Sequence, residues 1–186
     1  MTDKKRKGPR FLPGDPMPTK DVERMIRVDH AGEYGAKRIY EGQIAVLGKG
    51  PKGDMLRHMA EQEQVHLDYF SKELVKRRVR PTALMPIWHV AGFALGAGTA
   101  LIGEKAAMAC TVAVEEVIDE HYGEQRERLG EDEGALKETI ERFRLEEVEH
   151  RDIGYENGAE QAPASPFIIG SIKKGAKLAI WLAQRI

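Results

Sequence analysis

The sequence has 186 residues, which is long enough for one domain with a full hydrophobic core. Its 29 lysine and arginine residues balance its 30 aspartate and glutamate residues, so no bulk charge favours nucleic acid as a partner. The only cysteine, Cys110, excludes an intrachain disulfide framework and a cysteine-based zinc site, and we expect its thiol to be buried and inert.

Residues 1–19 are expected to form a disordered basic tail. Five basic residues lie among the first ten, but no apolar run follows them, which argues against a secretory signal. An arm that touches anionic lipid is the alternative interpretation of this tail. The folded domain is expected to span residues 20–186.

Helices are predicted throughout this domain, because the chain is rich in charged residues and poor in aromatic ones. A first helical hairpin is expected at about residues 20–79, with Thr19 capping its first helix and Asp54 capping its second. Glycines and a proline at residues 48–53 separate these two helices. A second hairpin is expected at about residues 104–157.

Two further segments are apolar. Residues 81–103 contain no Asp, Glu, Lys or Arg and are numerous enough for a membrane span, but two prolines and four glycines predict a poor regular helix. Residues 167–186 combine apolar residues with four basic ones and predict an amphipathic helix. Docking on the bundle and contact with a membrane both explain the apolar face of this helix, and the sequence leaves both open.

Acidic and histidine side chains interrupt the apolar stripe of each helix in the hairpins. Glu33 lies within the stripe of the first helix and Glu115 within that of the third, whereas Glu116 falls on another face. The returning helices both carry Glu-x-x-His, a spacing that brings a carboxylate and an imidazole to one face about a turn apart. These two pairs are Glu63 with His66 and Glu147 with His150.

The spacing around two glycines puts these residues at one height. Glu33 precedes Gly48 by 15 residues and Glu63 follows it by 15, a path of about 22 Å out and back at 1.5 Å per residue. Around Gly130, the corresponding spacings in the second hairpin are 15 and 17 residues. Packed together, the hairpins would present four glutamates and two histidines at one level, which is the ligand set of a ferritin-like di-iron carboxylate site.

Metal ions explain why such residues lie on apolar faces. Four ionised carboxylates could not share a bundle core unaided, because buried charges are costly and like charges repel. Two divalent cations would neutralise them, and oxygen and nitrogen ligands suit iron or manganese. A single membrane crossing by residues 81–103 would put the hairpins on opposite sides of the bilayer. The expected fold is therefore an all-α, ferritin-like four-helix bundle with an apolar crossover, either buried or interfacial, and a C-terminal amphipathic helix.

Five segments closely resemble the demethoxyubiquinone hydroxylases of coenzyme Q biosynthesis, and the resemblance extends over about residues 20–186. The segments are IRVDHAGEYGA at 26–36, RPTALMP at 80–86, GFALGAGTA at 92–100, CTVAVEE at 110–116 and EEVEHRDIG at 146–154. The resemblance implies a di-iron monooxygenase that hydroxylates the ring of demethoxyubiquinone with O₂ as co-substrate. It suggests NADH as the electron donor.

The resemblance also implies that six residues of this chain hold two iron ions. Glu63 and Glu147 would bridge the two ions. Tyr122 matches a family tyrosine and is expected to contact the ligands. The remaining ligands are Glu33 and His66 at one iron, and Glu115 and His150 at the other.

The implied substrate is a lipid quinone, and the implied location is peripheral on a membrane. This would be the cytoplasmic face of a bacterial inner membrane, or the matrix side of the mitochondrial inner membrane in a eukaryote. No Gly-x-Gly-x-x-Gly fingerprint after a strand is visible, so electrons would come from weakly bound NADH, through the quinone or through a partner. A helper protein or a homo-oligomer is compatible with this scheme. Two rival functions are ferritin-like handling of iron or peroxide and non-catalytic quinone binding.

Overall fold

The computed structural model describes residues 18–186, which form six α-helices and two short 3-10 helices and contain no strand. This confirms the predicted all-α fold. Residues 1–17, and with them most of the expected basic tail, lie outside the described residues. The helices are α1 (Pro18–Leu47), α2 (Gly53–Arg77), α3 (Met85–Ile102), α4 (Glu104–Arg128), η1 (Glu131–Glu133), α5 (Gly134–Glu156), η2 (Ala159–Gln161) and α6 (Ser165–Ala183).

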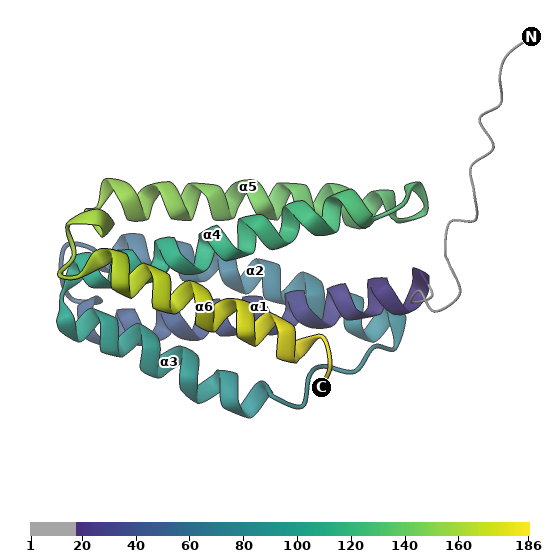
Figure 1. Ribbon diagram of the computed structural model, residues 1–186, viewed down its shortest axis with the longest axis horizontal. Helices are drawn as coiled ribbons and strands as arrows, with labels where there is room; N and C mark the ends of the chain where they lie inside the picture. Colours follow the sequence, from purple (N-terminus) through teal and green to yellow (C-terminus); the bar gives the residue numbers. More distant parts are fainter. Residues whose placement is uncertain (1–17) are drawn as a thin grey trace, which may run out of the picture.

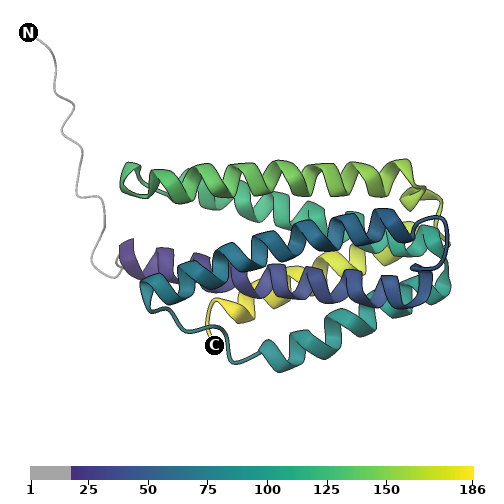
Figure 2. The ribbon, with the colours of Figure 1, turned by 180° about the vertical axis from the view of Figure 1, so that it is seen from behind.

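Four long helices, α1, α2, α4 and α5, run side by side along the long axis of the molecule (Figure 1). α1 packs along α2, and α4 packs along α5, so consecutive helices pair. α3 packs along α1 and α6 packs along α4, as additions to these four helices (Figure 2). The structure is a ferritin-like four-helix bundle with two further helices.

Two helix starts differ from the prediction. α1 begins at Pro18, so Thr19 belongs to the helix; a proline in the first turn is tolerated because its position needs no backbone N–H donor. α2 begins at Gly53, and Asp54 lies inside its first turn, where its carboxylate accepts a hydrogen bond from an arginine (2.6 Å). A Cβ at Gly53 would lie 2.2 Å from the carbonyl oxygen of Gly48, so the glycine at the start of α2 lets the turn pack closely.

The apolar segment between the hairpins forms a regular helix, α3, and the predicted irregularity is wrong. Two of its glycines, Gly92 and Gly96, pack against α1. A Cβ at Gly96 would lie 1.9 Å from the carbonyl oxygen of Ile39, and a Cβ at Gly42 of α1 would lie 2.3 Å from the carbonyl oxygen of Phe93. The two backbones therefore approach each other where glycine removes the side chain.

The other face of α3 is exposed and apolar. Ile87, Val90, Leu101 and Ile102 all expose more than half of their surface. Within residues 18–186, α3 is the one helix long and apolar enough to cross a membrane, judged by length and composition alone. In the structure it lies along α1, so it buries one face against the bundle and leaves the other uncovered.

The C-terminal helix, α6, also has two apolar faces. Ile168 and Ile169 pack against the hydrophobic core. Phe167, Leu178 and Trp181 are at least half exposed. The helix therefore docks on the bundle and still presents an apolar surface to its surroundings.

Two apolar clusters fill the bundle at different heights. Along α1, Ile26 belongs to one cluster and Tyr40 to the other, and Glu33 lies between them. Along α2, Met59 and Phe70 are divided between the clusters in the same way. A polar layer thus crosses the bundle between two hydrophobic regions.

Candidate metal centre

Six side chains from four helices meet in this polar layer. α1 and α4 each contribute one glutamate, and α2 and α5 each contribute a Glu-x-x-His pair. All six residues are at most 1% exposed. They are the six residues that the sequence predicts as ligands, namely Glu33, Glu63, His66, Glu115, Glu147 and His150.

The six residues form two overlapping groups, each with the geometry to hold one metal ion. Within a group, one ligand atom from each residue lies within 4.8 Å of all the others. Glu63 and Glu147 occur in both groups, which is the arrangement that bridging carboxylates require. The groups are Glu33, Glu63, His66 and Glu147, and Glu63, Glu115, Glu147 and His150.

Both histidines direct Nδ1 toward the carboxylates. Nδ1 of His66 lies 3.0 Å from Oε1 of Glu147 and 3.4 Å from Oε2 of Glu33. Nδ1 of His150 lies 3.2 Å from Oε2 of Glu147 and 3.3 Å from Oε1 of Glu63. Each imidazole therefore offers the same ring nitrogen to the centre.

The opposite ring nitrogens are held by residues that the sequence reasoning missed. Nε2 of His66 lies 2.7 Å from Oε2 of Glu146, and Nε2 of His150 lies 2.9 Å from Oε1 of Gln62. Glu146 accepts from Nε2 of His66, so Nδ1 is the ring nitrogen that faces the centre and would bind a metal ion once its proton is lost. Spacing in the sequence could have indicated both residues. Gln62 and Glu146 each lie four residues, about one turn, before the histidine of their own helix, and therefore close to the level of the centre.

Two tyrosines hold the glutamates of α1 and α4. Tyr122 donates a hydrogen bond to Oε1 of Glu33, so the structure brings it to the ligands as expected. Tyr40 donates to Oε1 of Glu115 at 2.7 Å, a contact that was not predicted. Each tyrosine lies two turns beyond the glutamate of its own helix and binds the glutamate of the other hairpin.

Burial and mutual repulsion shift the pKa values of the centre. Burial raises the pKa of Glu63 and of Glu115 well above the ordinary value, and the carboxylate of Glu147 raises both further. Burial also acts to raise the pKa of Glu147, but the imidazoles of His150 and His66, whose Nδ1 atoms face its carboxylate, outweigh burial and lower that pKa to about 2. Burial acts to lower the pKa of His66, but the carboxylates that face it raise that pKa to about 12. Without metal, these shifts favour the protonated forms of Glu63, Glu115 and His66.

Unpaired atoms show that the six residues fit a pair of cations. Buried polar atoms are normally hydrogen-bonded, yet eight buried atoms of this cluster have no partner. Two divalent cations would balance four carboxylates and would give these atoms partners. The eight atoms are Oε2 of Glu33, both carboxylate oxygens of Glu63, Nδ1 of His66, Oε2 of Glu115, both carboxylate oxygens of Glu147 and Nδ1 of His150.

An apolar cavity of about 500 Å³ lies beside the centre, between α1, α3, α4 and α6. Among the six cluster residues, only Glu33 lines it, and Tyr122 lines it too. Asp29 and His121 add polar groups, with Oδ1 of Asp29 3.4 Å from Nε2 of His121. Oδ2 of Asp29 is buried without a hydrogen-bond partner. The cavity therefore combines an apolar lining with one polar end next to the centre.

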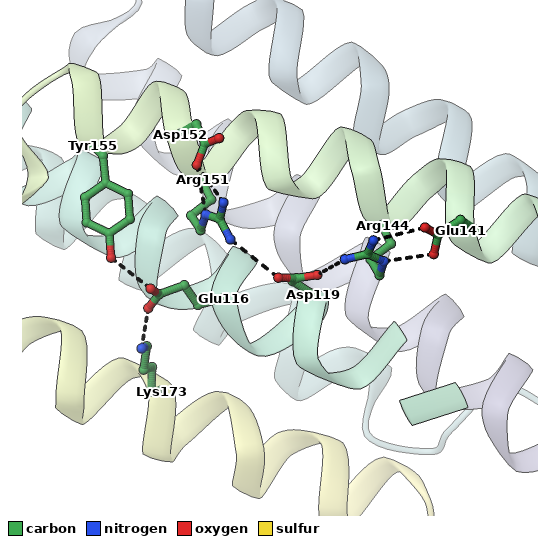
Figure 3. Close-up of polar contacts among 8 residues, drawn as sticks. All are labelled: Glu116, Asp119, Glu141, Arg144, Arg151, Asp152, Tyr155 and Lys173. Carbon is green, nitrogen blue, oxygen red and sulfur yellow. Dashed lines mark hydrogen bonds and ion pairs between the residues drawn. The ribbon is translucent and has the colours of Figure 1, made fainter. Parts of the chain in front are cut away.

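The residue after Glu115 points away from the centre. Glu116 accepts a hydrogen bond from Tyr155 of α5 (2.8 Å) and pairs with Lys173 of α6 (Figure 3). Asp119, one turn further along α4, binds two arginines of α5. The outer face of α4 thus connects α5 and α6, and the assignment of Glu115 rather than Glu116 to the centre agrees with the geometry.

Comparison with known proteins gives a family match over most of the chain. The family described as "Ubiquinone biosynthesis protein COQ7" matches residues 20–183. The 3-demethoxyubiquinol 3-hydroxylase of Rhodospirillum rubrum is 64% identical over 176 residues, covering 94% of this chain and 83% of that protein. The human NADPH-dependent 3-demethoxyubiquinone 3-hydroxylase, mitochondrial, is 53% identical over 169 residues, covering 89% and 78%. The 5-demethoxyubiquinone hydroxylase, mitochondrial, of Saccharomyces cerevisiae is 42% identical over 182 residues, covering 89% and 78%.

Proposed function

Because the chain belongs to the ubiquinone biosynthesis protein COQ7 family, we propose that it hydroxylates the ring of demethoxyubiquinone at a di-iron centre. The names of its relatives describe hydroxylation of demethoxyubiquinol or demethoxyubiquinone. The observation that carries the proposal is an apolar cavity in contact with a buried cluster of four carboxylates and two histidines. A quinone ring in this cavity would lie against Glu33.

We assign iron to the centre because carboxylate oxygen and imidazole nitrogen are the ligands of di-iron sites in four-helix bundles. When bound, the iron pair would supply the two-electron activation of O₂ that hydroxylation of the ring needs. The electrons are expected from a reduced nicotinamide nucleotide. The sequence resemblance suggests NADH, whereas the names of the mitochondrial relatives specify NADPH.

The residues around the cavity would bind and orient the substrate. A cavity of roughly 150 Å³ binds benzene. A cavity of about 500 Å³ therefore holds the quinone ring and the first part of the isoprenoid tail. Asp29 and His121 offer polar groups for the oxygen atoms of the ring, and the apolar lining excludes water. Tyr122 holds the Glu33 carboxylate in place beside the ring.

We further propose that the protein lies on a membrane surface through α3 and α6. Both helices line the cavity with one face and expose large apolar side chains on another. Such a surface would let a lipid quinone pass from the bilayer into the cavity. The expected location is the cytoplasmic face of a bacterial inner membrane or the matrix side of the mitochondrial inner membrane.

Turnover by the full chain, loaded anaerobically with Fe(II), tests the proposed function. A short-tailed demethoxyubiquinone, isotopically labelled O₂ and either NADH or NADPH should yield a hydroxylated ring that carries one labelled oxygen atom, measured by mass spectrometry. If iron-loaded protein gives no labelled product with either donor, the proposal is wrong. That result would favour an iron-handling protein or a non-catalytic quinone binder.

Gly175→Leu tests whether the cavity is the substrate site. Gly175 lines the cavity, and a Cβ added there meets no atom within 4 Å, so a leucine side chain has room to enter it. We expect kcat/KM to fall by roughly tenfold or more while the iron content is unchanged. Gly170→Leu is the matched control, because Gly170 has equally free space on the same helix but does not line the cavity. Equal losses in both variants would contradict the cavity assignment.

A further inference from the structure

The two hairpins contribute to the centre by nearly the same pattern. Tyr40 follows Glu33 by seven residues, and Tyr122 follows Glu115 by seven. Each tyrosine donates to the glutamate of the opposite hairpin. The Glu-x-x-His pairs of α2 and α5 also correspond. These contributions are therefore similar at the two metal positions and do not distinguish one position from the other.

The pattern differs at the residue before each shared glutamate. In α5 this residue is Glu146, whose Oε2 lies 2.7 Å from Nε2 of His66. In α2 it is Gln62, whose Oε1 lies 2.9 Å from Nε2 of His150. One histidine thus donates to a carboxylate, and the other donates to a neutral amide.

The metal position whose histidine contacts a carboxylate is also the position beside the cavity. Glu33, which belongs to that position alone, lines the cavity, whereas Glu115 does not. Asp29 lies one turn before Glu33, and Thr111 is its counterpart before Glu115. Asp29 is already engaged by two neighbouring side chains on α4, so Glu146 is the simpler source of a difference in metal affinity.

We propose that the two metal positions are unequal, and that Glu146 is a positioning residue that makes the Glu33–His66 position bind its ion first and more tightly. This inference rests on the metal centre of the proposed function. A carboxylate that accepts a hydrogen bond from one ring nitrogen of an imidazole makes the other ring nitrogen a stronger electron-pair donor to the metal ion. The carboxylate also adds negative charge near the cation. The neutral amide of Gln62 strengthens electron-pair donation by its histidine only weakly, and it adds no negative charge.

The size of the effect follows from the same contacts. Loss of the outer hydrogen-bond partner of a metal-bound histidine weakens metal binding by about 10- to 100-fold. The side chain of Glu146 is 29% exposed, and water screens part of its charge. We therefore expect a ratio near the lower end, about tenfold between the two positions.

Stepwise binding of Co²⁺ to the metal-free full chain tests this inference without turnover. Calorimetry should resolve two steps in the wild type, with the first step tighter. Glu146→Gln should weaken the first step by about tenfold, and Gln62→Glu should tighten the second. In the double variant, E146Q with Q62E, the order should reverse. Anomalous diffraction from crystals with one equivalent of Co²⁺ would then show the ion at Glu115 and His150 instead of at Glu33 and His66.

Glu149→Gln is the matched control, because it removes the same charge from an exposed position on the same helix. Both binding steps should be unchanged in this variant. Equal affinities in the wild type, first filling of the Glu115–His150 position, or a Glu146→Gln variant with unchanged steps would each overturn the inference. A chain that binds no Co²⁺ would overturn the metal centre itself, and this outcome is distinct from two equal sites.

Discussion

Glu63 and Glu147 occupy matching positions in the two hairpins, but the fold shifts the pKa values of their carboxylates in opposite directions. Glu147 lies between the Nδ1 atoms of both histidines, at 3.0 and 3.2 Å, and these two imidazoles keep its pKa low despite burial. Glu63 lies 3.3 Å from His150 alone, and burial with nearby carboxylates raises its pKa. In the metal-free chain, Glu147 therefore loses its proton at a lower pH than Glu63 does.

Glutamine substitutions of these residues should shift the stability of the metal-free chain in opposite directions. The folded-state pKa of Glu63 is raised above its ordinary 4.5, so its ionisation destabilises the fold as pH rises above that value, and Glu63→Gln removes this loss. The pKa of Glu147 is lowered from 4.5 to about 2, so its charge stabilises the fold above pH 4.5, and this stability is lost as pH falls toward 2.

Thermal unfolding followed by circular dichroism at about pH 8 checks this pair. We expect Tm to rise by several degrees in Glu63→Gln and to fall by several degrees in Glu147→Gln, since about 1–3 kcal/mol accompanies an unpaired buried group. A change of the same sign in both variants would contradict the opposite pKa shifts of Glu63 and Glu147. The same comparison of Glu63→Gln with the wild type at about pH 4 is the internal control. The gain in Tm should disappear at that pH, because Glu63 is then protonated in both the folded and the unfolded chain.

Among the elements, α3 and α6 determine the shape of the cavity in different ways. α3 is placed by glycines, because Gly96 meets the backbone of Ile39 and Gly42 meets the backbone of Phe93. α6 is placed by packing and by ion pairs with α4, including Lys177 with Glu120 at 2.7 Å. A change in the α1–α3 contact should therefore move the side of the cavity that α3 forms. It should not change the metal centre, whose residues lie on α1, α2, α4 and α5.

Gly96→Ala should destabilise the protein, because its Cβ would lie 1.9 Å from the carbonyl oxygen of Ile39 and would force α3 away from α1. The expected loss is about 1–3 kcal/mol in denaturant unfolding. Gly98→Ala is the matched control on the same helix. A Cβ there meets nothing within 4 Å, so its higher helix propensity should leave stability unchanged or raise it by up to about 1 kcal/mol. Equal stability of the two variants would contradict a glycine-dependent contact.

Over the whole molecule, the two hairpins meet through a layer of ionisable residues between two apolar clusters. α2 and α5 are linked within this layer by the contact of His66 with Glu146 and that of His150 with Gln62. Metal ions would join the same four helices through the unpaired atoms of the six clustered residues. Metal binding and stability of the bundle should therefore be coupled.

Metal binding should release protons, and the affinity should rise with pH. The pKa of His66 is raised to about 12, so its imidazole is protonated in the metal-free chain at neutral pH, and the raised pKa values of Glu63 and Glu115 favour their protonated forms. Each must lose its proton to bind a cation. Calorimetric titration with Co²⁺ in two buffers of different ionisation enthalpy measures the release. Heats that do not depend on the buffer would contradict this prediction.

By itself, the sequence determined which segments of the two hairpins are helices, which of their faces are apolar and the level at which the acidic and histidine residues lie. These properties depend on neighbours three or four residues apart, and helix geometry converts that spacing into a face and a height. Glu33 and Glu63 are equally distant from Gly48 and therefore lie at one level once the chain reverses there. The six clustered residues could be predicted on this basis, whereas the family was predicted from the five segments that resemble it.

Only the tertiary structure decided which side chains meet across the hairpins. Tyr40, Gln62 and Glu146 reach residues of the opposite hairpin, and such pairing depends on the rotation and tilt of one helix against another, which neither helix encodes alone. The glycines of α3 predict a broken helix when they are considered in isolation. Gly96 is compatible with a regular helix because the α1 backbone fills the space that its missing side chain leaves.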